Sequence, residues 1–236
     1  MPADAGFASY DTNEHPGYPN PEVDLSQYGV DPDPDGSKAA AVATGAAGVR
    51  AAFIYLDEQT ALNMWDHYFS NQGIQYKVEA ATMDPWMTAT VQHYPPDEHG
   101  VVPTPPATTA ATNREAVIAA AIAEADRTKK PAKRVFGTPW VLTAGDDGDY
   151  IHSLGRHQLS STTAVIAQPG TAGNHKIELR QQLHIYDSYD YSRTSDPSSN
   201  PANDAARVGH EAMRIGLAKP YFVLGSGGVS AWSGVR

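Results

Sequence analysis

The most constraining feature of this sequence is a stretch of alternating side chains at residues 177–185. Apolar Ile177, Leu179, Leu183 and Ile185 alternate with polar residues, and only Gln181 interrupts the apolar series. Successive side chains of a β-strand point to opposite faces, so a period of two predicts a strand with one buried face. We therefore expect a sheet in which this stretch forms a half-buried strand.

Two carboxylates bracket a phenol directly after this strand, at Asp187, Tyr189 and Asp190. If the strand ends in a turn there, carboxylates three positions apart can converge. Two acceptor groups held close are suited to a divalent cation such as Mg²⁺ or Ca²⁺, or to general acid–base chemistry. The alternative is structural, because Asp side chains also cap turns at strand ends. The spacing alone leaves both interpretations open.

The pattern of apolar residues changes near Pro139. Before it, an Ala-rich composition predicts a helix at 38–56, helical spacing predicts one at 58–71, and a capping Asn113 predicts one through about 127. A short strand is expected at 75–78. After Pro139, β character predicts strands at 140–143, 151–160, 162–167 and 219–224, with one helix at 203–216. The fold class is therefore α+β, with an N-terminal helical part packed on a mostly antiparallel, twisted or half-barrel sheet.

The domain division follows from the same change. We expect a single domain over residues 38–236, helical at 38–130 and β-rich at 139–236. Proline-rich residues 95–112 are interpreted as a loop, so that Asn113 caps the helix that follows. The basic residues after that helix are interpreted as its solvated end: Lys129, Lys130, Lys133 and Arg134.

Residues 1–37 form a distinct acidic and proline-rich segment. They hold eight of the 27 acidic residues and no Lys or Arg, so the remaining chain is nearly neutral. Such a composition buries too little apolar surface to order itself, which predicts an extended arm or linker. The arm is a candidate contact for a protein partner or a second copy of the chain. The nearly neutral remainder argues against nucleic-acid binding.

Composition and motifs exclude several further classes. The chain has no cysteine, which rules out disulfides and thiolate metal sites. No apolar run is long enough to span a membrane, and no signal peptide is visible at the N-terminus. The nine histidines show no zincin spacing, and neither the Gly-x-Ser-x-Gly elbow nor a dinucleotide-binding glycine motif is present.

The order of motifs resembles the C-terminal toxin-like domains of large secreted actinobacterial proteins. The resemblance covers roughly residues 55–232. It is carried by four stretches: His67–Gly73, Leu154–Leu159, Asp187–Tyr191 and Gly216–Tyr221. This resemblance implies an exported, effector-like domain with a secreted or extracellular location.

Asp187, Tyr189 and Asp190 are also similar to the Asp-x-Tyr-Asp motif of the colicin M-type catalytic domain. That resemblance implies cleavage of a lipid-linked pyrophosphate of the cell-wall precursor with a divalent cation. The family places a His-Arg pair six and seven residues after the second Asp, whereas this chain has Asp196 and Pro197 there. The nearest substitutes are Arg193 and His210.

Two functions follow as hypotheses. In the first, the chain is a metal-dependent hydrolase of phosphoester or pyrophosphate bonds. Asp187 and Asp190 hold the metal or one of them acts as a base, Tyr189 orients or donates, and Arg193 stabilises phosphate charge. His210 completes the set of candidate catalytic residues. In the second, the chain is a non-catalytic structural or binding module of an exported assembly, and the two aspartates cap a turn.

Overall fold

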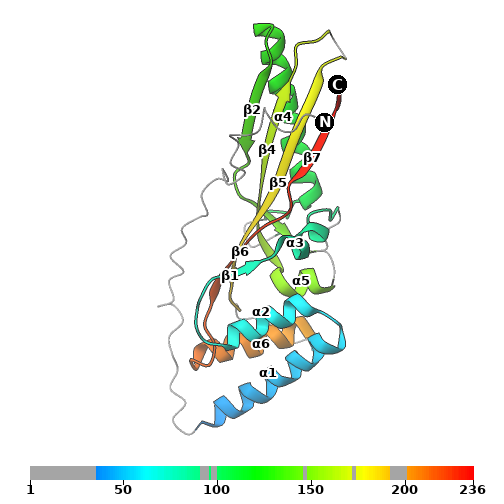
Figure 1. The fold of residues 1–236 in the computed structure, drawn as a ribbon. Coiled ribbons are helices and arrows are strands. Elements are labelled where there is room, and N and C mark those ends of the chain that lie inside the picture. Colours follow the sequence, from blue (N-terminus) through cyan, green and yellow to red (C-terminus); the bar gives the residue numbers. More distant parts are fainter. Residues whose placement is uncertain (1–35, 91–95, 97–99, 146–147, 172–173, 192–200) are drawn as a thin grey trace.

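The computed structural model describes residues 36–90, 96, 100–145, 148–171, 174–191 and 201–236 (Figure 1). In this part of the chain the helices are α1 (Ser37–Tyr55), α2 (Gln59–Phe69), α3 (Ala80–Trp86), α4 (Pro106–Thr128), α5 (Gly148–Leu154) and α6 (Pro201–Arg214). The strands are β1 (Tyr76–Val78), β2 (Ala132–Gly137), β3 (Val141–Ala144), β4 (Arg156–Ala167), β5 (Lys176–Tyr189), β6 (Tyr221–Ser226) and β7 (Ser230–Val235). The predicted α+β class is confirmed.

The described strands form one open sheet in the order β1-β6-β5-β4-β2. Only the β1–β6 pair is parallel, and the other pairs are antiparallel. The strand predicted from the alternating stretch is β5, which runs along the length of the molecule (Figure 1). It pairs with β4 along one edge and with β6 and then β7 along the other. The stretch with the clearest alternation is thus the central strand.

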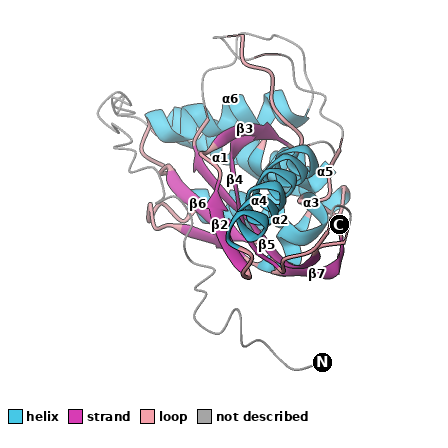
Figure 2. Ribbon diagram, turned by 90° about the horizontal axis from the view of Figure 1, so that it is seen from above, coloured by secondary structure: helices cyan, strands magenta, loops and turns pink. Residues whose placement is uncertain are grey.

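Helices cover the sheet in two groups. At one end of the molecule α4 packs on the sheet, which curves around one side of it when seen from above (Figure 2). Small and branched apolar residues make this contact: Val117, Ile118, Ala121, Ala125, Val165, Ile177 and Leu179. At the other end α1, α2 and α6 pack together around Phe53, Trp65 and Ala205 (Figure 1). The largest core cluster joins α2, α3 and α5 to β5 and β6.

The predicted loop at 95–112 is partly wrong, because α4 begins at Pro106. Proline is favoured in the first helical turn, where its missing N–H has no partner to lose. Asn113 is therefore inside α4 and does not cap it. Its side-chain nitrogen Nδ2 donates instead to Ser161 O at 2.7 Å and to Thr163 Oγ1 at 2.9 Å, which ties α4 to β4.

Two further expectations are corrected. Lys133 and Arg134 are not at a helix end but in β2, where they pair with Ile166 and Val165 of β4. Both charged side chains are exposed, which suits a strand at the edge of a sheet. The strand expected at 151–160 begins only at Arg156, because residues 148–154 form α5. Gly155, with φ 54°, lies in the left-handed conformation that ends this helix.

Other elements had no clear sequence signal. The helix α3 contains Pro85, and β7 follows the glycine-rich residues 225–228. The acidic arm at 1–37 lies outside the described residues except for Gly36 and Ser37. Within the described part of the chain, no helix has the length and apolar character required to cross a bilayer.

Candidate active site

The final part of β5 carries the predicted acidic motif. Asp187 and Tyr189 pair with Val223 and Tyr221 of β6, so both remain in the strand. The strand therefore does not end in a turn at Asp187, since pairing with β6 extends it to Tyr189. Asp190 follows directly, and its backbone N–H donates to Ser188 O at 3.0 Å. Asp187 and Tyr189 are two positions apart and share one face of the sheet.

Asp187, Tyr189 and Asp190 line a cavity of about 460 Å³, which we call the acidic cavity. It lies where the end of β5 meets α5, the start of β4, α1 and α6. The other lining residues come from these elements and from the end of the motif: Phe53, Ile151, His152, Ser153, Leu154, Gly155, Arg156, Ser188, Tyr191, Ala205 and Ala206. The fold thus places the two aspartates beside His152, which comes from a distant part of the sequence. Arg156 also borders the cavity, but its guanidinium donates from Nη2 to Pro96 O at 3.1 Å, and the pairing of Gln158 with Tyr186 puts Arg156 and Asp187 on opposite faces of the sheet.

The acidic cavity changes the protonation of Asp187. Burial raises the pKa of Asp187 well above its ordinary value, and the charge of Asp190 raises it further. A hydrogen bond from the Ser188 backbone opposes this shift. Two neighbouring carboxylates repel when both are ionised, so one of them tends to keep a proton or to bind a cation. Asp187 is therefore favoured to keep its proton.

Tyr189 lies in a buried cluster of aromatic rings. Its ring stacks on that of Tyr221, with centroids 4.9 Å apart, and its hydroxyl lies 2.7 Å from the hydroxyl of Tyr191. Burial raises the pKa of Tyr189, so the phenol stays protonated. Tyr68 packs edge-on against the rings of Tyr189 and Tyr191. The cluster fixes the end of β5 and with it the position of Asp187.

The two remaining predicted residues are not placed in the acidic cavity. Arg193 lies outside the described residues. His210 is on α6, and its Nδ1 donates to Tyr191 O at 3.0 Å. The described residues that line the cavity do not include His210. Its catalytic role stays a prediction, and the geometry gives it a contact to the backbone of the motif.

His152 and Arg156 are the residues that sequence reasoning missed. His152 is in the last turn of α5, and Arg156 follows Gly155 at the first position of β4. The stretch Leu154–Leu159 was recognised as a motif but was assigned to a strand, which would have sent these side chains elsewhere. The glycine between them was the available signal, because a glycine that ends a helix orients the residues on both sides of it.

A metal site was predicted at Asp187 and Asp190. Carboxylate oxygens are the ligands that Mg²⁺ and Ca²⁺ prefer, and both side chains line one cavity. Among the described residues, no group of three or more His, Asp or Glu side chains is arranged around a common point for a metal. The pair would therefore supply only part of a coordination sphere, with water or substrate oxygens completing it.

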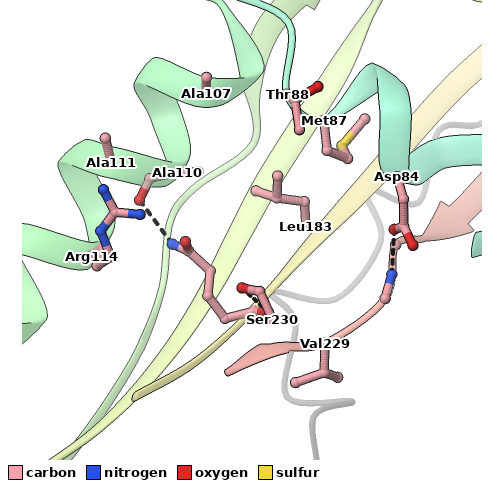
Figure 3. Close-up of a pocket in the computed structure, with 13 residues that line it drawn as sticks. Asp84, Met87, Thr88, Ala107, Ala110, Ala111, Arg114, Leu183, Val229 and Ser230 are labelled. Atoms are coloured by element: carbon pink, nitrogen blue, oxygen red, sulfur yellow. Dashed lines mark hydrogen bonds between the residues drawn. The ribbon is translucent and has the colours of Figure 1, made fainter. Parts of the chain in front are cut away.

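A second cavity, of about 640 Å³, lies on the same face of β5, and we call it the apolar cavity (Figure 3). Its lining is mostly apolar: Met87, Ala107, Ala110, Ala111, Leu183 and Val229. Its carboxylate is already engaged, since Asp84 accepts the Gly228 N–H at 2.6 Å (Figure 3). The side-chain nitrogen Nε2 of Gln181 donates to Ala110 O at 2.8 Å (Figure 3). Nε of Arg114 lies 3.6 Å from Oε1 of Glu115. No pair of acidic groups faces this cavity from its described lining.

Comparisons with known proteins give one distant similarity. No family model matches this sequence, and no curated protein matches it. Among solved structures, the chain is similar to PaeM, a colicin M-like bacteriocin produced by Pseudomonas aeruginosa, with a TM-score of 0.39 and 15% identity. The match covers 75% of this chain and 51% of that one, so the chain spans about half the length of the bacteriocin. A similarity of this degree transfers no activity, and any function has to be supported by the chemistry of the acidic cavity.

Proposed function

We propose that the chain is an exported, effector-like hydrolase of phosphoester or pyrophosphate bonds, acting in the acidic cavity. The observation that carries the proposal is that Asp187 and Asp190 line one cavity together with His152. Carboxyl and imidazole groups move protons, and a pair of carboxylates can hold a cation. A substrate with a lipid-linked pyrophosphate remains part of the proposal through the resemblance of the Asp-x-Tyr-Asp motif.

The two carboxyl groups have different environments, which suits different tasks. Asp187 is favoured to keep its proton, so it can donate a hydrogen bond or a proton to a phosphoryl or leaving oxygen. Asp190 lies beyond the strand end and is the acceptor of the pair.

A divalent cation would be held by Asp187 and Asp190. When bound, it would supply charge neutralisation at the phosphoryl oxygens. Binding requires a deprotonated Asp187, so affinity for Mg²⁺ or Ca²⁺ should increase as the pH rises. Calorimetric titration with each cation at two pH values, on the wild type and on Asp190→Asn, measures this directly.

The test of function is a cleavage assay with the purified chain. Substrates should include an activated phosphodiester, a nucleoside diphosphate and a lipid-linked pyrophosphate, each with Mg²⁺, with Ca²⁺ or with a chelator. The wild type should release phosphate or a phosphomonoester from at least one substrate, and Asp190→Asn should lower this rate while retaining the melting temperature. Binding of a pyrophosphate without any turnover would instead leave the chain as a binding module.

A further inference from the structure

The junction between α5 and α2 holds a carboxylate–imidazole contact beside the acidic cavity. Glu58, the residue before α2, is 6% exposed, and its Oε2 lies 2.7 Å from Nδ1 of His152. An ionised carboxylate only accepts hydrogen bonds, so Nδ1 carries the proton and donates it. This contact leaves Nε2 as the ring nitrogen that can accept a proton. Glu58 thus selects the tautomer of His152.

Glu58 is not needed to cap α2, although it occupies the capping position. Its side chain makes no capping hydrogen bond. The first N–H groups of α2 are satisfied by Asp149 of α5, whose two carboxylate oxygens accept from Ala61 N at 2.7 Å and Thr60 N at 3.1 Å. Asp149 therefore ties α5 to α2 on its own. A purely structural role for the Glu58–His152 contact would duplicate that tie.

The position of His152 connects this contact to the predicted chemistry. Its imidazole lines the acidic cavity together with Asp187, Asp190 and Arg156. The ring of Phe53 lies 6.2 Å from it, which gives the imidazole an apolar neighbour on one side. A ring with one nitrogen held by a buried carboxylate and the other left to a cavity has the arrangement of a general base with its orienting acid.

We propose that His152 is the general base of the acidic cavity and that Glu58 is its positioning residue. This rests on the proposed hydrolase function. Nε2 of His152 accepts a proton from water while the water oxygen bonds to phosphorus. The bond from phosphorus to the leaving oxygen breaks, and its electron pair departs with the leaving phosphate or alkoxide. Glu58 stabilises the imidazolium that forms.

Kinetics on matched variants test the proposal. His152→Gln should lower kcat on the order of 10²–10⁴-fold with little change in KM. Glu58→Gln should lower kcat by about tenfold or more and should change the pH profile, because the neutral amide cannot stabilise an imidazolium. The control is Asp149→Asn, which weakens the tie between α5 and α2 without touching the Glu58–His152 contact. It should leave kcat and the pH profile unchanged.

Nitrogen NMR of His152 gives a readout that does not depend on turnover. The wild type should show a protonated Nδ1 and a lone pair on Nε2, and Glu58→Ala should lose this preference. A wild-type signal with the proton on Nε2 would overturn the proposal. Full turnover by His152→Gln would overturn it while the hydrolase function stands. Absence of cleavage by the wild type on every substrate would overturn both.

Discussion

The acidic and the apolar cavity lie on the same face of β5. The distance along the strand from Leu183 in the apolar cavity to Asp187 in the acidic cavity is about 13 Å. The apolar cavity is the larger, at about 640 Å³ against about 460 Å³. Asp84 and Gln181 of the apolar cavity are bonded to neighbouring backbone, whereas the acidic cavity is lined by two aspartates and a histidine. The fully buried Ile185 separates the two along β5. Volume alone therefore does not identify a site, and the chemistry of the groups that face a cavity is the better guide.

The difference between the two cavities has a structural origin. At the apolar cavity the continuous strand formed by β6 and β7 bulges, because residues 227–229 lie opposite only Gln182 and Leu183. Asp84 accepts the Gly228 N–H on this bulge. At the acidic cavity β6 pairs with β5 without interruption, so Asp187 stays in register and is held by its neighbours. A regular ladder thus leaves a carboxylate for chemistry, and a bulge consumes one.

The largest expected effect is on catalysis. Asp187→Asn should lower turnover on the order of 10²–10⁴-fold, because the amide cannot donate a proton to the leaving oxygen. The matched variant in the apolar cavity, Asp84→Asn, should leave turnover unchanged. Both are measured with the substrate that the wild type cleaves. Equal losses in the two variants would remove the distinction between the cavities.

The next effect is the acid sensitivity of the wall behind the acidic cavity. His157 is buried, which lowers its pKa to about 4, and its Nε2 accepts from the Tyr150 hydroxyl at 3.0 Å. The unfolded chain binds a proton at this histidine at higher pH than the folded chain does. The stability contributed by His157 is therefore complete above about pH 6.5 and is lost as the pH falls toward 4. The total is about 3 kcal/mol.

Urea unfolding of the wild type and His157→Gln at several pH values between 4 and 7 checks this. As the pH falls from 7 to 4, the free energy of unfolding of the wild type should decrease by about 3 kcal/mol more than that of the variant. Arg114→Gln, in the apolar cavity, is the control and should follow the wild type. Parallel curves for the wild type and His157→Gln would contradict the prediction.

An effect of opposite sign is expected from Asp187. Its pKa is raised in the folded chain, so the folded chain binds the proton more tightly than the unfolded chain does. Stability is then complete below the ordinary pKa of Asp and is lost as the pH rises through the raised value. The loss is about 1.4 kcal/mol for each unit of the shift.

The Asp187→Asn variant removes this loss. It should be more stable than the wild type at pH 8 and should lose that advantage at pH 4, as measured by urea unfolding. Exposed Asp84 gives the comparison, since Asp84→Asn should bring no gain at pH 8. A lower stability of Asp187→Asn at both pH values would show that the carboxylate is structural.

The smallest effect concerns the bulge that closes the apolar cavity. Asp84→Ala removes the acceptor of the Gly228 N–H and should cost about 1 kcal/mol, since the contact is exposed to solvent. Asp84→Asn keeps an acceptor oxygen and should cost less. The free energy of unfolding of the two variants measures the difference. A cost well above that of an exposed hydrogen bond would indicate that the bulge is more important for folding than its exposure suggests.

The sequence by itself determined the fold class and the elements whose pattern is local. The period of two over residues 177–185 specified β5, and helical spacing specified α2 and α6, because these patterns describe which face each element buries. An Ala-rich composition indicated α1. Asp187, Tyr189 and Asp190 follow this stretch directly, so the sequence alone also placed them close to one another. Proline and glycine misled where their meaning depends on context: Pro106 begins α4, and Gly155 ends α5.

Only the tertiary structure decided the contents of the acidic cavity. Glu58, His152 and Arg156 are far from Asp187 in sequence, and no local pattern states that α5 lies against both α2 and the end of β5. Strand pairing also overrode local preference, since charged Lys133 and Arg134 form β2 by pairing with β4. The register of Asp187 against Val223 depends on the same kind of long-range contact. A single chain encodes these contacts in the burial of its whole core, so they emerge only when the core is assembled.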